Sequence, residues 1–321
     1  MSTTVTVDVA GGPMGGAARF REEFYRYLTR AQRPDVKVIG AQQRVDPSWL
    51  LRRELAKRAR ARRVALNNVG FVAPGGERWT LLGNALHFLT DAEVHGLDSS
   101  RRTSIMRQAA VVRFAARRSD VLIAPCSAMA ERVVSILPRV SDRLVVRMHP
   151  VSPETIPKVG PDPVILCPVL FASYKHMVPR IKEWLTAVDR YINPSVKLLV
   201  TATPSEVPAS LASNERIELV GKLEYAALRG LWLRSRAIYF PSGLESFGFP
   251  LAEARVNGQP VIARDTAQNR EIAGPALCGF SVGNTDSLRY AIERALTTEV
   301  APEPGPFNPD AYFDWMLGAR Q

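Results

Sequence analysis

The stretch Ala237-Ile-Tyr-Phe-Pro-Ser-Gly-Leu-Glu-Ser-Phe-Gly-Phe-Pro-Leu-Ala-Glu253 decides the fold, because it runs from a strand through a loop into a helix. Residues 237–240 are an uninterrupted apolar run of strand type, and residues 241–248 have the composition of a loop. Pro250 fits the first turn of a helix, where its missing N–H costs nothing. The free N–H groups of that helix would point toward Glu245, as in a ligand-binding loop.

Strand and helix patterns alternate along the rest of the chain. Strands are expected at residues 5–9, 36–39, 120–125, 144–148, 164–166, 197–201, 217–220 and 260–263. Residues 63–72 contain another apolar strand that ends near Asn67-Asn68. Helices are expected at residues 17–28, 52–63, 81–89, 101–117, 128–137, 178–191, 225–234 and 251–257. Two successive halves of this kind predict an α/β protein with two Rossmann-like, doubly wound parallel sheets that face each other across a cleft.

A proline-rich stretch separates the two halves. Residues 150–163 hold five prolines and one glycine, which disfavours regular structure. We therefore predict domains at residues 1–149 and 150–307. In doubly wound sheets, ligands bind at the carboxyl ends of the strands, where residues 11–16, 171–175 and 242–248 fall.

Composition indicates an ordinary globular chain of 321 residues, 46% hydrophobic and 23% charged. No run approaches the roughly 18 to 20 apolar residues of a membrane span, and the N-terminus lacks a secretory signal, so a cytoplasmic location is expected. The cysteines Cys126, Cys167 and Cys278 are scattered in apolar segments, which predicts reduced core thiols.

The net charge of +11 suggests a polyanionic partner: nucleic acid, an anionic membrane face or a phosphorylated ligand. The densest basic run, residues 52–63, carries almost no aromatic residues for stacking on bases, so no nucleic-acid partner is expected. A solvated helix face remains the plain alternative to a membrane or acceptor-binding patch.

The motif of residues 241–254, followed by Gly258-Gln-Pro-Val-Ile262 and Arg270-Glu-Ile-Ala-Gly274, resembles the donor-binding signature of retaining family 4 glycosyltransferases, which have the GT-B fold. Its Glu-x7-Glu core has the glycine, the proline and the second glutamate in the family's places. Weaker similarity extends over most of residues 120–317, and the first hundred residues match only in pattern. The resemblance implies that residues 150–307 bind a nucleotide sugar and that residues 308–321 form a helix packing back on the N-terminal domain.

The resemblance also implies a role for each carboxylate of the motif. Glu245 would face the donor sugar and the positive charge that develops at C1, although a loop carboxylate capping the next helix is the alternative. Glu253 would bind the ribose hydroxyls, although spacing alone places it in the first helical turn, where any acid is stabilised by the helix dipole. Backbone N–H groups near the diphosphate would come from Ser246, Phe247, Gly248 and Phe249.

Lys175 follows the first strand of the second half, where the family pairs a lysine with an arginine about five residues earlier. The resemblance implies that this lysine neutralises the departing diphosphate. Leu170 stands at the arginine position, so the clamp is incomplete unless Arg180 or a residue of the first domain compensates. An exposed lysine without a role is the alternative. Lys222 is a further donor-binding candidate.

Residues 11–16 form a glycine-rich turn that lacks the endings of a P-loop or a dinucleotide fingerprint. They are either a tight strand-to-helix turn or, as the resemblance implies, a loop that meets donor phosphates through Gly15 and Gly16, with Arg19 assisting. His87 lies roughly where the family has a histidine near the donor sugar, although a structural histidine is the alternative. No metal-ligand cluster or Ser-His-Asp triad is present in the pattern, so no metal and no cofactor are expected.

The resulting hypothesis is a retaining glycosyltransferase of polysaccharide biosynthesis that uses a front-face mechanism. It would move a mannosyl or glucosyl group from GDP-mannose or UDP-glucose to a hydroxyl of a glycan, lipid or small molecule, and would contact an anionic membrane peripherally. Two alternatives are a non-catalytic scaffold that binds nucleotide sugars or glycans, and a nucleotide-sugar epimerase or hydrolase.

Overall fold

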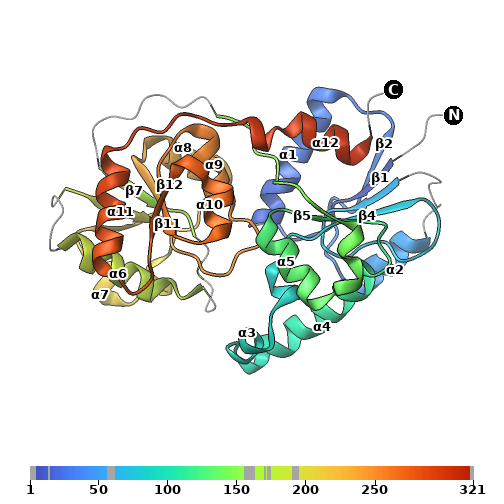
Figure 1. Ribbon diagram of the computed structural model, residues 1–321, viewed down its shortest axis with the longest axis horizontal. Coiled ribbons are helices and arrows are strands. Elements are labelled where there is room, and N and C mark those ends of the chain that lie inside the picture. Colours follow the sequence, from blue (N-terminus) through green and yellow to red (C-terminus); the bar gives the residue numbers. More distant parts are fainter. Residues whose placement is uncertain are drawn as a thin grey trace. The chain divides into compact units, whose positions relative to one another are not determined.

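The structure is a computed structural model that describes residues 5–13, 15–55, 62–154, 163–169, 171, 175–189 and 195–318. The chain divides into two compact units. Unit 1 comprises Met1–Pro150, Glu245–Phe247 and Phe307–Gln321, and unit 2 comprises Val151–Leu244 and Gly248–Pro306. Each unit is built on one six-stranded parallel sheet flanked by helices (Figure 1).

The sheet of unit 1 has the strand order β2-β1-β3-β4-β5-β6, and all its pairs are parallel. Its strands are β1 Val5–Asp8, β2 Val36–Ile39, β3 Arg62–Ala65, β4 Glu77–Leu81, β5 Val121–Ala124 and β6 Leu144–Val146. Its helices are α1 Gly16–Ala31, α2 Pro47–Leu55, η1 Ala85–Phe88, α3 Asp91–His95, α4 Ser99–Ala116, α5 Ser127–Ile136, η2 Pro138–Arg143 and α12 Pro309–Leu317, the last preceded by η6 Gly305–Phe307. The chain turns from β1 to β2 on one side and then continues from β3 on the other, so the topological switch point lies between β1 and β3.

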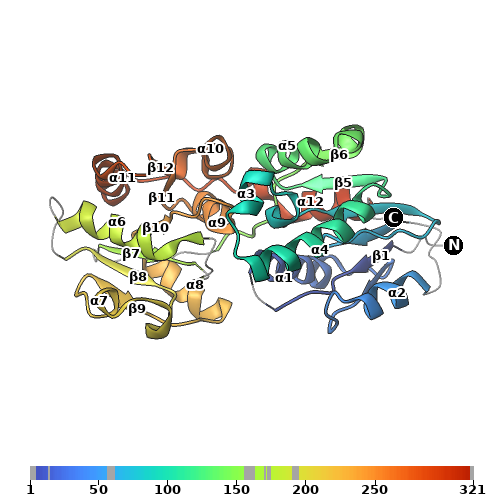
Figure 2. The ribbon, with the colours of Figure 1, turned by 90° about the horizontal axis from the view of Figure 1, so that it is seen from below.

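The sheet of unit 2 has the order β12-β11-β10-β7-β8-β9 and is also parallel throughout. Its strands are β7 Val164–Cys167, β8 Lys197–Val200, β9 Ile217–Leu219, β10 Ala237–Phe240, β11 Val261–Arg264 and β12 Leu277–Phe280. Its helices are α6 Met177–Asp189, η4 Pro204–Glu206, α7 Ala209–Ala212, α8 Tyr225–Arg234, α9 Phe249–Asn257, α10 Ala267–Ala273, η5 Gly274–Ala276 and α11 Thr285–Thr297. Here the switch point lies between β7 and β10, and α6 and α11 pack side by side (Figure 2).

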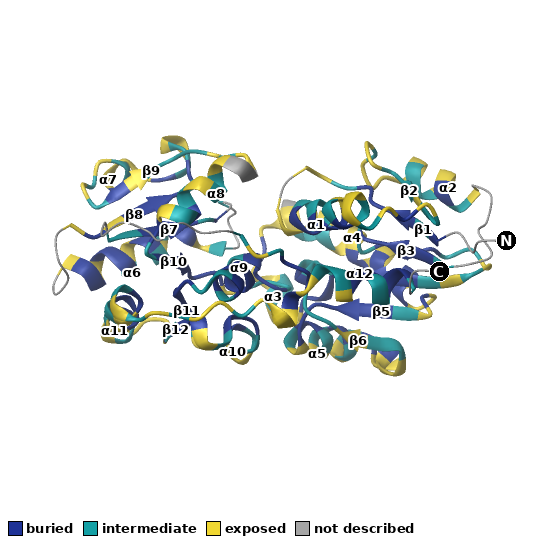
Figure 3. Ribbon diagram, turned by 90° about the horizontal axis from the view of Figure 1, so that it is seen from above, coloured by how far each residue is buried: buried dark blue, intermediate teal, exposed yellow. Residues whose placement is uncertain are grey.

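The core of each unit follows from its sequence pattern. All four residues of β10 are buried, as expected for a central strand covered on both faces. In unit 1, α1 buries Phe20, Phe24 and Tyr27 on one face, where they pack against Phe313 of α12 with ring centroids 5.1 to 5.6 Å apart. Figure 3 shows the strands of both units as buried and the exposed residues mostly on helices and loops.

A buried charge pair fixes the carboxyl end of β1. The side chain of Asp8 is fully buried and forms an ion pair with Arg53 of α2, which is also buried. Its carboxylate further accepts hydrogen bonds from the Ala10 N–H at 3.0 Å, the Trp49 indole at 3.2 Å and the Asn67 amide at 2.8 Å. These bonds tie β1 to α2 and to the loop that follows β3.

The two-sheet α/β fold predicted from the sequence is confirmed, but several element predictions are wrong. Residues 81–89 do not form a helix: β4 ends at Leu81, and only a short 3-10 turn follows. The strand predicted within residues 63–72, ending near Asn67-Asn68, is present as β3, and residues 66–71 form a loop. The sequence also missed β12 and α11. Of the proline-rich boundary, residues 155–162 lie outside the described residues.

The basic run 52–63 is not a continuous helix, since α2 ends at Leu55, β3 begins at Arg62 and the residues between them lie outside the described part. Arg53 and Arg63 are buried rather than solvated, and Arg62 stacks over Trp79 with its guanidinium carbon 4.0 Å from the ring centroid. Among the described helices, none is both long and apolar enough to cross a membrane.

The Asp8 network predicts a large effect on stability. In Asp8→Asn, the shape of the side chain is kept but Arg53 loses its counter-charge in the core, which costs about 3 to 5 kcal/mol of the free energy of unfolding. Asp142→Ala, which removes a carboxylate that is 77% exposed, is the control and changes stability by less than about 1 kcal/mol. Urea unfolding measures both. Equal midpoints for the two variants would contradict the assignment.

Candidate functional site

The connection from β10 to α9 has the geometry of a ligand-binding loop. β10 ends at Phe240, and α9 begins at Phe249 with Gly248 as its N-cap. Gly248 has φ +91°, and a Cβ atom on it would lie 3.1 Å from the Phe240 ring and 3.0 Å from the Leu251 side chain. Only glycine fits this conformation without strain. Helix starts of this kind bind anions in proteins. In α9 the Leu251 N–H donates to the Gly248 carbonyl at 2.9 Å and Pro250 has no N–H, so an anion at this helix start would meet the backbone around Gly248.

The two carboxylates of the motif differ in position. Glu245 lies in the loop and is partly exposed. Glu253 is only 8% exposed. Because α9 begins at Phe249, two residues earlier than predicted, Glu253 lies in the second turn and α9 has no acid in its first turn. The prediction that Glu253 occupies the first turn, and the helix-dipole alternative based on it, are therefore wrong.

Residues Glu245–Phe247 belong to unit 1 by their contacts. The Ser246 hydroxyl donates to the Gly83 carbonyl at 2.8 Å, and the Cys126 thiol donates to the Ser246 carbonyl at 3.3 Å. The ring of Phe247 is buried and lies edge-on to His149, with centroids 4.8 Å apart. The residues next to Glu245 are thus anchored by packing and hydrogen bonds.

His87 lies in the segment that follows Gly83, whose carbonyl accepts the hydrogen bond from Ser246. It is in η1, four residues after Gly83, and its backbone carbonyl accepts a hydrogen bond from Arg113 at 2.8 Å. Its ring Nε2 lies 3.4 Å from the Asn84 amide nitrogen. Burial lowers the pKa of His87 to about 4, so the imidazole is neutral near pH 7. A neutral ring can exchange hydrogen bonds with a ligand but does not carry a positive charge there.

The glycine-rich turn opens α1. Gly15 is the N-cap of α1 with φ +77°, and Gly16 is the first residue of the helix. Both residues are exposed, so their backbone is open to a ligand. Arg19 is 7% exposed and pairs with Glu23 at 2.7 Å, which turns it into the core instead of toward the glycines. The structure therefore disfavours the assisting role predicted for Arg19.

The predicted cations of unit 2 are separated in the sheet. Lys175 is partly buried in the connection from β7 to α6, next to the switch point, while Leu170 lies outside the described residues. Lys222 follows the edge strand β9, two strands away from β7, and pairs with Glu206 at 2.9 Å. Its exposed position fits a surface ion pair.

Two further arginines, Arg264 and Arg180, lie at this edge. The sequence analysis did not name Arg264, and it named Arg180 only as a residue that compensates for Leu170. Arg264 is the last residue of β11, next to β10, and Arg180 lies in the first turn of α6. The charge of Arg180 is close enough to lower the pKa of Arg264, together with burial, which is the larger cause. A charged residue directly after the apolar run 260–263 was the available signal.

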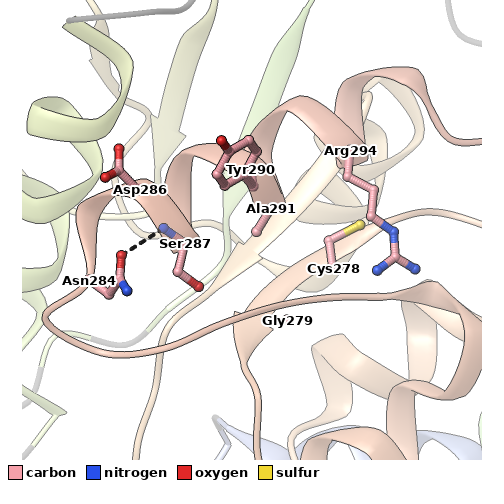
Figure 4. Close-up of a pocket in the computed structure, with 8 residues that line it drawn as sticks. All are labelled: Cys278, Gly279, Asn284, Asp286, Ser287, Tyr290, Ala291 and Arg294. Atoms are coloured by element: carbon pink, nitrogen blue, oxygen red, sulfur yellow. Dashed lines mark hydrogen bonds between the residues drawn. The ribbon is translucent and has the colours of Figure 1, made fainter.

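A pocket of about 390 Å³ lies between β12 and α11 (Figure 4). Its lining includes Cys278, Tyr290 and Arg294, and the Asn284 amide in it accepts from the Ser287 N–H at 2.9 Å, which caps α11. β12 is the edge strand, three positions from β7 in the sheet. None of the predicted site residues lines this pocket, so it is separate from the switch point.

Two parallel, doubly wound sheets in one chain, each with a loop and a helix start at its switch point, define the GT-B class of glycosyltransferase folds. The chain is similar to sucrose-phosphate synthase from Thermosynechococcus elongatus, with TM-score 0.62, 15% identity, and 99% of this chain and 95% of that chain covered. It is also similar to the lipopolysaccharide outer core galactosyltransferase WaaB, with TM-score 0.58, 12% identity and 98% of each chain covered. At these identities the likeness shows the fold.

Staphylococcus aureus TarM is a third neighbour, with TM-score 0.54 and 12% identity over 78% of this chain. The match covers 50% of TarM, so the chain spans about half its length. No curated protein sequence gives a significant match. Residues 206–304 match the family described as "Glycosyl transferases group 1". This match confirms the family resemblance over these residues, which include the motif of residues 241–254.

The two buried histidines predict how stability depends on pH. Burial lowers the pKa of His149 to about 3 and that of His87 to about 4, whereas both titrate near 6.5 in the unfolded chain. The unfolded state therefore binds more protons below pH 6.5, and the folded state loses stability as the pH falls from 6.5 toward 4. Each histidine contributes a loss of about 2 kcal/mol at pH 5.

The variant His149→Phe tests this dependence, because a phenyl ring keeps the edge-on contacts with Phe20 and Phe247 but cannot titrate. We expect it to lose about half of the wild-type destabilisation between pH 7.5 and pH 5.0, measured by urea unfolding. The same pH dependence in the variant and the wild type would show that His149 is protonated in the fold.

Proposed function

We propose that this glycosyltransferase moves a hexosyl group, with retention of configuration, from a nucleotide diphosphate sugar to an acceptor hydroxyl, without a metal ion. The observation that carries the proposal is the loop from β10 to α9. It combines a partly exposed carboxylate at Glu245, fixed neighbours on its C-terminal side, and a helix N-terminus that starts at a left-handed glycine. The carboxylate would act on the donor sugar, the fixed neighbours would hold that carboxylate in place, and the helix N-terminus would bind the diphosphate.

In the proposed mechanism, the bond from C1 of the sugar to the diphosphate oxygen breaks as the bond from C1 to the acceptor oxygen forms on the same face. A diphosphate oxygen takes the acceptor's proton, so no separate general base is required. Glu245 stabilises the positive charge at C1, and this interaction is stronger in the transition state than in the ground state.

The other residues bind and orient the donor. Lys175 and the backbone N–H groups of Phe247, Gly248 and Phe249 stabilise the negative charge of the leaving diphosphate. Glu253 accepts hydrogen bonds from the ribose hydroxyls. Further proposed contacts are the backbone of Ser246, of Gly15 and of Gly16 with the phosphates, the neutral ring of His87 with the sugar, and Lys222 at the edge of the donor site.

The donor proposed is GDP-mannose or UDP-glucose, and the acceptor is a hydroxyl of a glycan, a lipid or a small molecule in polysaccharide assembly. TarM was solved in complex with UDP, and WaaB is a galactosyltransferase. These neighbours favour including UDP-galactose beside the two proposed donors in a screen. A donor that binds only the folded protein raises the thermal unfolding midpoint, so a thermal-shift panel identifies the base.

Glu245→Gln tests the mechanism. The amide keeps the size of the side chain but removes the negative charge, so kcat/KM for transfer falls by about 10² to 10³-fold while donor binding is retained. Glu224→Gln, at the exposed start of α8, is the matched control and leaves transfer unchanged.

Transfer is measured as acceptor-dependent release of the nucleoside diphosphate. Near-normal transfer by Glu245→Gln would contradict the role of this carboxylate. Free sugar or an epimer formed without any acceptor would instead favour a hydrolase or epimerase, and donor binding without turnover would favour a scaffold.

The proposed contact with an anionic membrane is better assigned to α4 than to residues 52–63, whose described arginines are largely engaged inside unit 1. α4 has four arginines and no acidic residue, and Arg117 and Arg118 follow directly after it. Its exposed residues include Met106, Val111 and Phe114, 39% to 48% exposed. Exposed apolar side chains among arginines offer an anionic membrane surface both apolar area and positive charge.

A triple variant tests this surface: Phe114→Ser with Arg117→Gln and Arg118→Gln. Each arginine near an anionic surface contributes about 1 kcal/mol, so we expect on the order of 25-fold weaker sedimentation with phosphatidylglycerol-containing vesicles. Tyr290→Ser with Arg289→Gln, an exposed aromatic and arginine pair on α11, is the control. Wild-type protein that does not bind these vesicles, or a triple variant that binds them normally, would overturn the proposal.

A further inference from the structure

The carboxyl edge of the unit 2 sheet carries an arginine to which the mechanism gives no role. Arg264 ends β11 and is half-buried. Its Nε donates to the Pro241 carbonyl at 3.0 Å, which fixes the guanidinium to the first residue of the loop that leads to Glu245. The two terminal nitrogens of Arg264 remain for other contacts.

Gly243 gives the guanidinium its position. A Cβ atom at Gly243 would lie 2.2 Å from Nη1 and 2.6 Å from Cζ of Arg264. The guanidinium therefore lies directly against the loop backbone, in space that any larger residue would take. Gly243 itself is exposed, so the arginine is held near the surface of the loop.

The charges around Arg264 leave it without a carboxylate partner among the described residues. Arg180 lies close enough to repel it. Glu183 is the acid whose charge acts on it, but one Glu183 oxygen pairs with Arg180 at 2.9 Å and the other accepts from the Gly283 N–H at 2.8 Å. Two neighbouring guanidinium groups with one engaged carboxylate are stabilised when an anion binds to both.

The sequence supplies a reason for this arrangement. A lysine and an arginine were expected to hold the donor diphosphate, but Leu170 occupies the arginine position. Lys175, Arg180 and Arg264 all follow strands or open a helix at the carboxyl side of β7 and β11, around the switch point. This is the side of a doubly wound sheet where phosphate ligands bind.

We propose that Arg264, supported by Arg180, is the diphosphate-binding arginine of this enzyme and replaces the one absent at Leu170. Its planar guanidinium, oriented by Pro241 and Gly243, binds a phosphate through two parallel N–H donors. The ligand class is a nucleoside diphosphate, free or linked to a sugar. The inference rests on the proposed function, since it assigns the diphosphate end of the same donor.

Calorimetry on the full chain with UDP and GDP, at fixed ionic strength, tests the assignment. Arg264→Gln weakens binding of the diphosphate that the wild type binds by about 10- to 100-fold, because a hydrogen-bonded charge contact is lost. Binding of the corresponding nucleoside changes less than about 3-fold. Arg289→Gln is the matched control, because Arg289 lies on α11, outside the motif, and already pairs with Glu293 at 2.8 Å.

A second variant separates position from charge. Gly243→Ala leaves every charge in place but displaces the guanidinium, so it also weakens diphosphate binding. Thermal unfolding of each variant in the absence of nucleotide establishes that it is folded. An unchanged affinity in Gly243→Ala would overturn the claim that Arg264 is positioned by this loop.

The outcomes distinguish this inference from the proposed function. If the wild type binds a diphosphate and Glu245→Gln abolishes transfer, but Arg264→Gln binds like the wild type, the inference is wrong and the function stands. An equal loss of nucleoside and diphosphate binding also overturns it. If the wild type binds neither diphosphate nor any donor, both are wrong.

Discussion

The parallel direction of every strand is the constraint on which both units depend. Parallel neighbours place all carboxyl ends of a sheet at one edge, so each βα loop emerges on the same side. Antiparallel pairing of even one central strand would move its loop to the opposite edge. Strand direction therefore brings together the loops after β7, β10 and β11, which are far apart in sequence.

The carboxyl edge of each sheet carries charged side chains, and the two units stabilise this edge differently. In unit 1, a buried carboxylate, Asp8, gathers backbone and side-chain donors, so the end of β1 is satisfied internally. In unit 2, the equivalent edge carries cations, of which Arg264 has no carboxylate partner in the described ranges. An internally satisfied network rigidifies its loop, whereas cations without counter-charges favour an anionic ligand.

The sequence predicted those parts of the structure that depend on local chemistry. The apolar run 237–240 favours a strand, the glycine at 248 permits a positive φ, and the proline at 250 fixes a φ suited to the first helical turn. β10 and the start of α9 therefore lie at or near their predicted places. β4 was missed because it has only three buried residues and follows two glycines. Burial of Arg53 was also beyond prediction, because its partner Asp8 is 45 residues away in sequence and pairing requires the folded sheet.

The candidate site divides in the same way. Glu245 and Glu253 are recognisable because they occupy fixed positions in one continuous motif. Arg264 is 19 residues after Glu245 and reaches the loop only because β11 pairs with β10 in parallel register, Phe240 opposite Ala263. A change at position 170 can therefore be compensated from another strand, since a phosphate responds to the positions of charges and donors and not to their order in the chain. The sequence motif shows that the expected arginine is absent at position 170. The position of Arg264 beside the loop follows only from the pairing of β11 with β10.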